Sequence, residues 1–230
     1  MTHVTGIACG NGHLSHGVWK GIAPHVNIIS LKILDRNGQG NSLQAIRALR
    51  WIMDNHRKYN IRVVNLSIGT NDRKVNQPLK EAAERLWQAG IVVVAAAGNP
   101  DGQKAPPPAV SSGVISVGAW EDRACFRSAP SFRFTKEAPL YPDLWAKGDD
   151  VISVLSPDFD FTLPGRSRQN MVNAHYIRMS GASMATPLVS GAAAILLEQH
   201  PRARPNEIKK MLLELTRPTE GFLTQELFLQ

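Results

Sequence analysis

Apolar residues along this chain follow two patterns that alternate. Runs of consecutive apolar and β-branched residues, typical of buried parallel strands, occupy residues 26–34, 62–68, 91–97, 113–119 and 150–155. Amphipathic or longer apolar segments of helical length occupy residues 42–59, 76–89, 188–199 and 206–215. Strands that alternate with helices predict an α/β fold with a mostly parallel sheet.

The ends and faces of the predicted helices support this assignment. We expect Ser42 to cap the first helix, whose apolar stripe would comprise Leu43, Ile46, Leu49, Trp51 and Met53. Gly90 would end the second helix, whose inward face would comprise Leu79, Ala82, Ala83 and Leu86. Pro205 stands at the start of the last helix, a position that proline prefers.

Composition and charge narrow the class of protein. With 230 residues, 43% of them hydrophobic, the chain has the content of one globular domain with a core. Its formal net charge is +7, but the arginines are scattered: Arg123, Arg127, Arg133, Arg166, Arg168, Arg202, Arg204 and Arg217. No nucleic-acid motif accompanies them, so we expect a solvated basic face and no nucleic-acid partner. A nucleic-acid-binding domain, with steeply salt-dependent affinity, is the less favoured alternative.

Other features limit location and partners. Cys9 and Cys125 are too few for a disulfide framework and lack metal-ligand spacing, so we expect ordinary thiols and no metal. No apolar run reaches the roughly 18 residues that span a bilayer. No signal peptide follows Met1. We expect a cytoplasmic monomer with no membrane partner, and secretion is the alternative.

A serine in a run of small residues is a candidate nucleophile. Residues 179–187 read Met-Ser-Gly-Ala-Ser-Met-Ala-Thr-Pro and place Ser183 where an irregular segment enters an apolar helix. Pro187 lacks a backbone N–H, so we expect it in the first turn, with Ser183 at or just before the helix N-terminus. The unpaired N–H groups there favour a developing negative charge. Taken alone, this segment fits a helix-capping serine equally well.

An asparagine ends the most apolar of the predicted strands. Residues 91–100 read Ile-Val-Val-Val-Ala-Ala-Ala-Gly-Asn-Pro and place Asn99 at the carboxyl end of a buried strand. Ligands of α/β sheets bind at such ends, where a side-chain amide can donate to an oxyanion. The alternative is an ordinary turn asparagine.

Five segments, in order along the chain, resemble motifs of the subtilisin-like serine proteases (subtilases). Residues 181–187 are similar to the family's serine motif, Gly-Thr-Ser-Met-Ala-x-Pro, and residues 96–99 to the Ala-Ala-Gly that precedes its oxyanion asparagine. Residues 65–69, Asn-Leu-Ser-Ile-Gly, resemble the strand that pairs with substrate. Residues 21–24, Gly-Ile-Ala-Pro, and 2–6, Thr-His-Val-Thr-Gly, resemble the family's Gly-Val-Ala-Pro and the end of its His-Gly-Thr-His-Val-Ala-Gly.

The resemblance implies a fold, a reaction and a set of residues. It implies a three-layer subtilisin-like α/β fold that lacks the N-terminal strands, with residues 1–218 as the C-terminal portion of the catalytic domain and 219–230 as a tail. It implies a serine endopeptidase without a cofactor, acting on polypeptides through an acyl-enzyme on Ser183, with Asn99 donating to the oxyanion. The residues implied to bind substrate and wall its pocket are Ser67, Ile68, Gly69, Ala96, Ala97 and Gly98.

The same resemblance places two catalytic residues outside the chain. The family's catalytic histidine would fall one position before Met1, and His3 matches the second, non-catalytic histidine. The catalytic aspartate would lie earlier still. We therefore expect an N-terminally truncated chain that is nearly inactive alone. Asp35 ends a strand that carries no catalytic residue in the family, and no base is evident among the remaining histidines: His13, His16, His25, His56, His175 and His200.

Three further expectations follow. The family's aspartate-bearing strand would lie between residues 28–34 and 63–68, so without it the isolated chain should be unstable. Residues 10–20, where many subtilases bind calcium, contain no carboxylate, and we expect no calcium there. The alternative function is a non-catalytic relic or pseudoenzyme that binds peptides or proteins.

Overall fold

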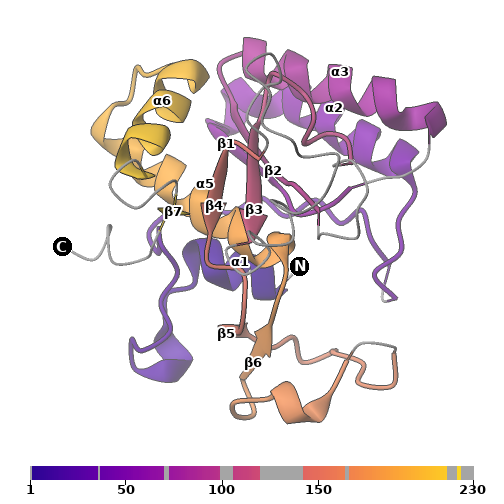
Figure 1. Cartoon of the computed structure of the whole chain (residues 1–230), viewed down its shortest axis with the longest axis vertical. Coiled ribbons are helices and arrows are strands. Elements are labelled where there is room, and N and C mark those ends of the chain that lie inside the picture. The colour runs from indigo at the N-terminus through magenta and orange to yellow at the C-terminus, as the bar shows by residue number, and fades with distance from the viewer. Residues whose placement is uncertain are drawn as a thin grey trace.

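The computed structural model of the chain describes residues 2–35, 37–69, 73–98, 106–119, 142–163, 166–216 and 222–223. Figure 1 shows helices on both sides of a central sheet, with a small two-stranded ribbon projecting from one end. In chain order the elements are α1 (Thr2–Cys9), η1 (His13–Ser15), α2 (Ser42–Tyr59), β1 (Val63–Leu66), α3 (Arg73–Gln88), β2 (Val92–Ala96), β3 (Ile115–Ala119), β4 (Leu144–Ala146), β5 (Val151–Val154), η4 (Arg168–Asn170), β6 (Tyr176–Met179), α5 (Ala182–Gln199), α6 (Pro205–Thr216) and β7 (Phe222–Leu223).

The central sheet has the strand order β1-β2-β3-β4-β7, and every neighbouring pair is parallel. In register, Leu66 lies opposite Ala95, so the residues that follow β1 lie beside those at the end of β2. The carboxyl ends of all these strands meet at one edge of the sheet.

Two hydrophobic cores cover the two faces of this sheet. Val92 and Val94 of β2 face a core shared with α1, α5 and α6, whereas Val93 and Ala95 face a core shared with α2 and α3. All four side chains are fully buried. The predicted three-layer α/β fold with a parallel sheet and flanking helices is therefore confirmed (Figure 1).

The sequence located α2 correctly, predicted its inward face in part through Ile46 and Leu49, and misplaced its cap. Asn41, not Ser42, is the N-cap residue, because its side chain accepts a hydrogen bond from the Leu43 amide at 2.8 Å. Leu43, Trp51 and Met53 are exposed. The helix buries positions that lie on one side at 3.6 residues per turn: Ala45, Ile46, Leu49 and Ile52.

The other elements agree with prediction in part. Helix α3 begins at Arg73, earlier than expected, and buries Leu79, Ala83 and Leu86. Strands β1, β2 and β3 lie inside their predicted ranges. Strand β5 lies in its range as well, but it pairs antiparallel with β6 in a separate ribbon. Strands β4 and β6 were not predicted, and β7 lies in the segment expected as a tail.

The strand predicted at residues 26–34 is wrong. This segment makes no strand pairing apart from a bridge between Leu34 and Gly40, and Ile28 and Ile29 are exposed. A strand needs a neighbour for its backbone groups, and none of the described strands lies beside this segment. Instead, an apolar cleft of about 710 Å³ separates it from β1, with α1, α2 and α5 also contributing to its walls.

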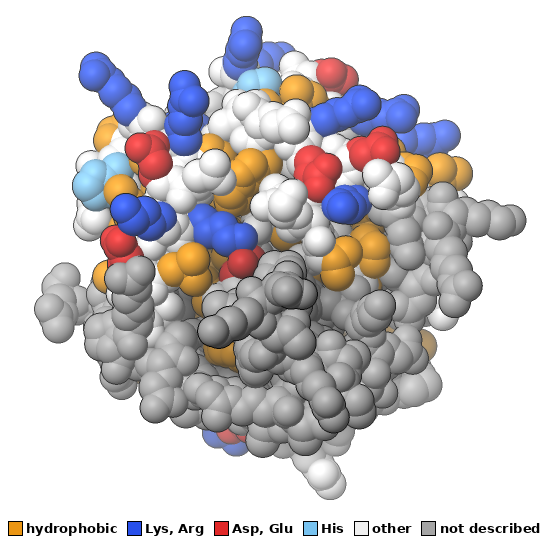
Figure 2. All heavy atoms as spheres, turned by 45° about the horizontal axis from the view of Figure 1, so that its top comes forward, with side chains coloured by type: hydrophobic (Ala, Val, Ile, Leu, Met, Phe, Trp, Pro, Cys, Tyr) orange, Lys and Arg blue, Asp and Glu red, His pale blue; other side chains and the backbone are white. Residues whose placement is uncertain are grey.

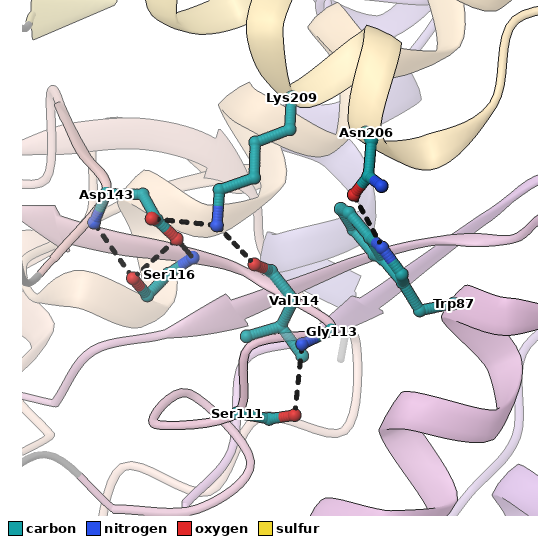
Figure 3. Close-up of polar contacts among 8 residues, drawn as sticks. All are labelled: Trp87, Ser111, Gly113, Val114, Ser116, Asp143, Asn206 and Lys209. Carbon is teal, nitrogen blue, oxygen red and sulfur yellow. Dashed lines mark hydrogen bonds and ion pairs between the residues drawn. The ribbon is translucent and has the colours of Figure 1, made fainter. Parts of the chain in front are cut away.

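At the other side of the sheet, polar contacts tie α6 to the strands. Lys209 of α6 forms an ion pair with Asp143 at 2.8 Å and donates to the Val114 carbonyl at 2.9 Å. Asp143 also accepts hydrogen bonds from the backbone N–H and the hydroxyl of Ser116 at 2.8 and 2.9 Å. Figure 3 shows these residues converging beneath the helix.

The surface carries its positive charge in a dispersed form. Figure 2 shows Lys and Arg side chains spread over the described face, with acidic side chains among them. Two of the arginines lie over aromatic rings, Arg166 over Phe159 and Arg168 over Phe161. Of the arginines named above, Arg123, Arg127, Arg133 and Arg217 lie outside the described residues, as does Cys125. No helix in the described ranges has the length and apolar character needed to cross a bilayer.

Candidate functional site

Ser183 is the second residue of α5, at the helix N-terminus that the sequence predicted for it. Strand β6 leads into this helix through Ser180 and Gly181. Gly181 has φ of 129°, a backbone conformation that favours glycine, and its N–H donates to the Gly148 carbonyl at 2.7 Å. The Ser180 hydroxyl donates to Asp149 at 2.7 Å and accepts from the Asp150 N–H at 2.9 Å. These contacts fix the turn that presents Ser183.

Pro187 lies deeper in the helix than expected. It is the sixth residue of α5, not part of the first turn, because the helix begins at Ala182. A helical carbonyl accepts from the N–H four residues later, so the Ser183 carbonyl has lost its helical donor. The Ser67 hydroxyl replaces that donor and lies 2.9 Å from the Ser183 carbonyl oxygen.

The contact between Ser67 and Ser183 is reciprocal. The Ser183 hydroxyl donates to the Ser67 carbonyl at 3.3 Å, and both residues are half-buried. The candidate nucleophile is therefore next to the segment expected to pair with substrate, Ser67, Ile68 and Gly69, which leaves the carboxyl end of β1.

The residues expected to wall a pocket lie beside that segment. Ala96 and Ala97 are buried at the end of β2, and Gly98 follows with φ of 86°. Pro106 packs over both segments, because a Cβ added to Gly69 or Gly98 would lie 2.5 or 3.1 Å from its ring atoms. The six residues expected to bind substrate therefore lie together at this end of the sheet. Ser183, the seventh of the eight candidates, is joined to them through Ser67. Asn99, the eighth, lies outside the described residues.

No histidine within the described ranges hydrogen bonds to Ser183. His3 is buried, and its Nε2 atom lies 3.1 Å from the carbonyl oxygens of both Val151 and Ile177. Burial lowers the pKa of His3, because the charged form would lose its hydration. His13, His16 and His175 line a separate open cleft, and His200 lies at the far end of α5.

The described residues contain no cluster of metal ligands. Among them, no group of three or more His, Cys, Asp or Glu side chains is placed to hold a metal ion. Cys9 is half-buried, its Sγ donates to the Thr5 carbonyl at 3.2 Å, and burial raises the pKa of its thiol.

Sequence reasoning missed two polar residues beside the nucleophile. Asn65 of β1 and Ser190 of α5 are hydrogen bonded to each other at 2.9 Å, and Asn65 donates to the Ser67 hydroxyl at 3.0 Å. A usable signal was present, since Ser190 is the only polar residue in the apolar run from 188 to 197.

Comparisons with known proteins point to one family. Residues 2–226 match the family model described as "Subtilase family". Serine protease AprX of Bacillus subtilis is 35% identical over 234 residues, covering 92% of this chain and 51% of the relative. Subtilisin DY of Bacillus licheniformis is 30% identical and covers 88% of this chain and 69% of the relative. Minor extracellular protease Epr of Bacillus subtilis is 31% identical, covering 93% and 29%. The chain spans about half the length of AprX.

Proposed function

Because this chain belongs to the subtilase family, we propose that it carries the nucleophile and substrate-binding edge of a serine endopeptidase. The observation that carries the proposal is the position of Ser183, at the start of α5 and in reciprocal contact with Ser67. Ser183 would attack a peptide carbonyl and form an acyl-enzyme, which water then hydrolyses.

Stabilisation of the oxyanion has two proposed sources. The backbone N–H of Ser183 lies in the first turn of α5, where N–H groups lack helical acceptors and the helix dipole favours negative charge. The side-chain amide of Asn99 would donate from the end of the β2 segment. Removing one such donor lowers the rate constant by about 10²- to 10³-fold.

Substrate would bind as an added strand. Ser67, Ile68 and Gly69 continue the outer strand of the described sheet and would pair with the backbone of an extended polypeptide. Ala96, Ala97 and Gly98 would form a pocket wall. Because their side chains are small, we propose that the pocket accepts a large apolar side chain.

The general base and its orienting carboxylate are proposed to come from sequence upstream of residue 1. This proposal rests on the family resemblance and on the described histidines, none of which is hydrogen bonded to Ser183. Loss of the base costs about 10⁶-fold in rate, so the 230-residue chain alone should be nearly inert. The alternative is a pseudoenzyme that binds peptides along residues 67–69.

For location, an extracellular enzyme is now the better proposal. The expected cytoplasmic location has no support in the comparisons, whereas two relatives are named as extracellular proteases. We retain a monomer without a nucleic-acid or membrane partner as part of the proposal.

The test is covalent labelling with a fluorophosphonate probe. We would compare the 230-residue chain with a protein extended by the in-frame genomic sequence upstream. Labelling of the extended protein only, lost in Ser183→Ala and retained in Ser111→Ala, is the expected result. Ser111 is a suitable control because its hydroxyl is also hydrogen bonded, but it precedes the amino end of β3, whereas Ser183 lies beside the carboxyl end of β1. An upstream stop codon, or an extended protein that folds and is not labelled, would favour the pseudoenzyme.

A further inference from the structure

We infer that Asn65 and Ser190 are positioning residues for Ser183, acting through Ser67; the inference rests on the proposed function. Three hydrogen bonds join these residues in sequence. Ser190 Oγ donates to Asn65 Oδ1 at 2.9 Å, Asn65 Nδ2 donates to Ser67 Oγ at 3.0 Å, and Ser67 Oγ donates to the Ser183 carbonyl oxygen at 2.9 Å.

The donors in this relay all point in one direction. A serine hydroxyl has one proton, and Ser67 uses it on the Ser183 carbonyl, so Ser67 accepts from Asn65. The side-chain amide of Asn65 must therefore turn its nitrogen toward Ser67 and its oxygen toward Ser190. Ser190 then supplies the proton that this oxygen needs. Hydrogen bonds aligned in this way polarise and strengthen one another.

Ser190 holds the orientation of the Asn65 amide. Its hydroxyl has two acceptors within reach, Asn65 Oδ1 at 2.9 Å and the Thr186 carbonyl at 3.2 Å, and the shorter distance favours Asn65. Without this hydroxyl, Asn65 Oδ1 has no donor among the described residues, and the amide gains the freedom to flip. A flipped amide presents an oxygen to Ser67 and withdraws the N–H that fixes it.

Burial makes the hydrogen bonds of the relay energetically important. Ser190 is 5% exposed and Asn65 is half-buried, and both line the wall of the apolar cleft beside β1. An unpaired polar group in such a setting is costly, so each of these residues requires the other. Ser183 and Ser190 are seven residues apart, about two turns, and so lie on the same face of α5.

We expect the relay to act on the reaction and not on substrate binding. Among the described residues, the side chains of Asn65 and Ser190 hydrogen bond to each other, to the Ser67 hydroxyl and to the Thr186 carbonyl, and the last bond of the relay holds the peptide unit of the nucleophile. Pro187 has removed the helical bond that would otherwise hold that unit. Loosening the relay should therefore slow acylation while the affinity for the probe stays constant.

The experiment compares Ser190→Thr with Ser190→Val in the upstream-extended protein. These two substitutions have nearly the same shape and differ in the hydroxyl, so the cost of packing a larger side chain affects both. We would measure the fluorophosphonate labelling rate against probe concentration, which separates the limiting rate constant from half-saturation. Ser190→Ala and the control Ser111→Ala complete the set, and near-ultraviolet circular dichroism gives the folded fraction of each protein.

The expected result is a limiting rate constant about five- to tenfold lower for Val and Ala than for Thr and wild type, as for one lost hydrogen bond. Half-saturation should not change, and Ser111→Ala should label at the wild-type rate. Equal limiting rate constants in folded Thr and Val variants would overturn the inference and leave the proposed function standing. Absence of labelling in the folded wild-type extended protein would overturn both.

A second measurement does not need labelling. The side-chain amide protons of Asn65, assigned by nuclear magnetic resonance in the same proteins, should exchange slowly with solvent in wild type and in Ser190→Thr. They should exchange faster in Ser190→Val. Equal exchange in the Thr and Val variants would contradict the orienting role of Ser190 whatever the reactivity of Ser183.

Discussion

The region beneath α6 and the region beside β1 differ in how closely the neighbouring elements are bonded to the parallel sheet. On the α6 side, Lys209, Asp143 and Ser116 form a connected set of bonds between the helix and two strands (Figure 3). On the β1 side, the outer strand faces a 710 Å³ apolar cleft, and the extended segment 26–34 across it has almost no pairing. The first side is held together by bonds between described residues. The second is open, and on the proposed function it would receive a further element from upstream sequence.

The candidate nucleophile lies on the β1 side. Ser183 is held through Ser67 at the end of β1, and Asn65 and Ser190 line the same cleft. On the proposed function, the α6 side would supply stability, whereas the β1 side would supply chemistry. Four predictions test this division, from the largest expected effect to the smallest.

The cleft on the β1 side should dominate the stability of the isolated chain. Each buried backbone group left unpaired costs about 1–3 kcal/mol, and a whole domain is stable by only about 5–15 kcal/mol. We expect the 230-residue chain to aggregate or to unfold without a cooperative transition, and the upstream-extended protein to melt cooperatively. Circular dichroism melting measures both. A cooperative transition of the isolated chain above about 50 °C would show that the cleft carries no such cost.

On the α6 side, Asp143→Ala should be the most destabilising single substitution. It removes the ion pair with Lys209 and the two hydrogen bonds that the carboxylate accepts from Ser116, and we expect a loss of about 3 kcal/mol. Lys209→Met keeps the apolar stem and should cost about half as much. Urea unfolding of the extended protein gives both values. Labelling of Ser183 in the folded variants should stay at the wild-type rate, and a large fall would break the division between the two sides.

His3 should make the folding stability of the β1 side, which α1 helps to form, sensitive to acid. Helix α1 carries Val4 and Ala8 on the cleft wall, while His3 points to the β5–β6 ribbon. Its Nε2–H must donate, since both neighbours of that atom are carbonyls, and the buried Nδ1 has no partner among the described residues. Protonation would place a second N–H where none of the described residues offers an acceptor.

The sign of this effect follows from the pKa. Because burial lowers the pKa of His3 in the folded state, the unfolded chain binds the proton first as pH falls below about 6.5. Stability should be full above that value and decline toward lower pH by at most about 1.4 kcal/mol per pH unit. Urea unfolding between pH 7 and 5 measures the slope. His3→Gln should reduce it, and an unchanged slope would assign it to other groups.

The smallest effect is expected for a surface ion pair on the helical layer. Lys80 and Glu84 of α3 lie 3.9 Å apart, and their side chains are 37% and 28% exposed. Water screens such a pair, so Lys80→Ala should change the free energy of unfolding by no more than about 0.5 kcal/mol. The same urea titration provides the value. A loss comparable with that of Asp143→Ala would show that stability is not concentrated beneath α6.

The sequence predicted those features that depend on local pattern. The stripe of α2 around Ile46 and Leu49, the buried run of β2 and the helix N-terminus at Ser183 each follow from the periodicity or chemistry of a few neighbouring residues. Features that depend on distant residues were missed. Residues 26–34 have a strand-like composition, but pairing requires a neighbour. Strand β4 has only three residues, Leu144–Ala146, and its apolar run is too short to detect.

The site shows the same limit. Residue types and motif order indicated Ser183, Ser67 and the small residues at the end of β2 as candidates, and the structure places them close together. Nothing in residues 65 and 190 taken separately indicates a pair, because the bond between them joins positions 125 apart in the chain. The location of Pro187 was misjudged for a related reason. Proline prefers the first turn of a helix, but it can lie deeper when a side chain from another element replaces the backbone N–H that it lacks, as the Ser67 hydroxyl does here.

The carbonyl of Ser183 also has a consequence for folding. Since its donor comes from Ser67 and not from its own helix, an isolated peptide containing α5 would form helical turns without assembling the reactive geometry. Covalent labelling of Ser183 would then report the docking of β1 onto α5, a tertiary event. In a refolding experiment, far-ultraviolet circular dichroism would detect the helix first. Labelling by the probe would begin later, when β1 has docked onto α5.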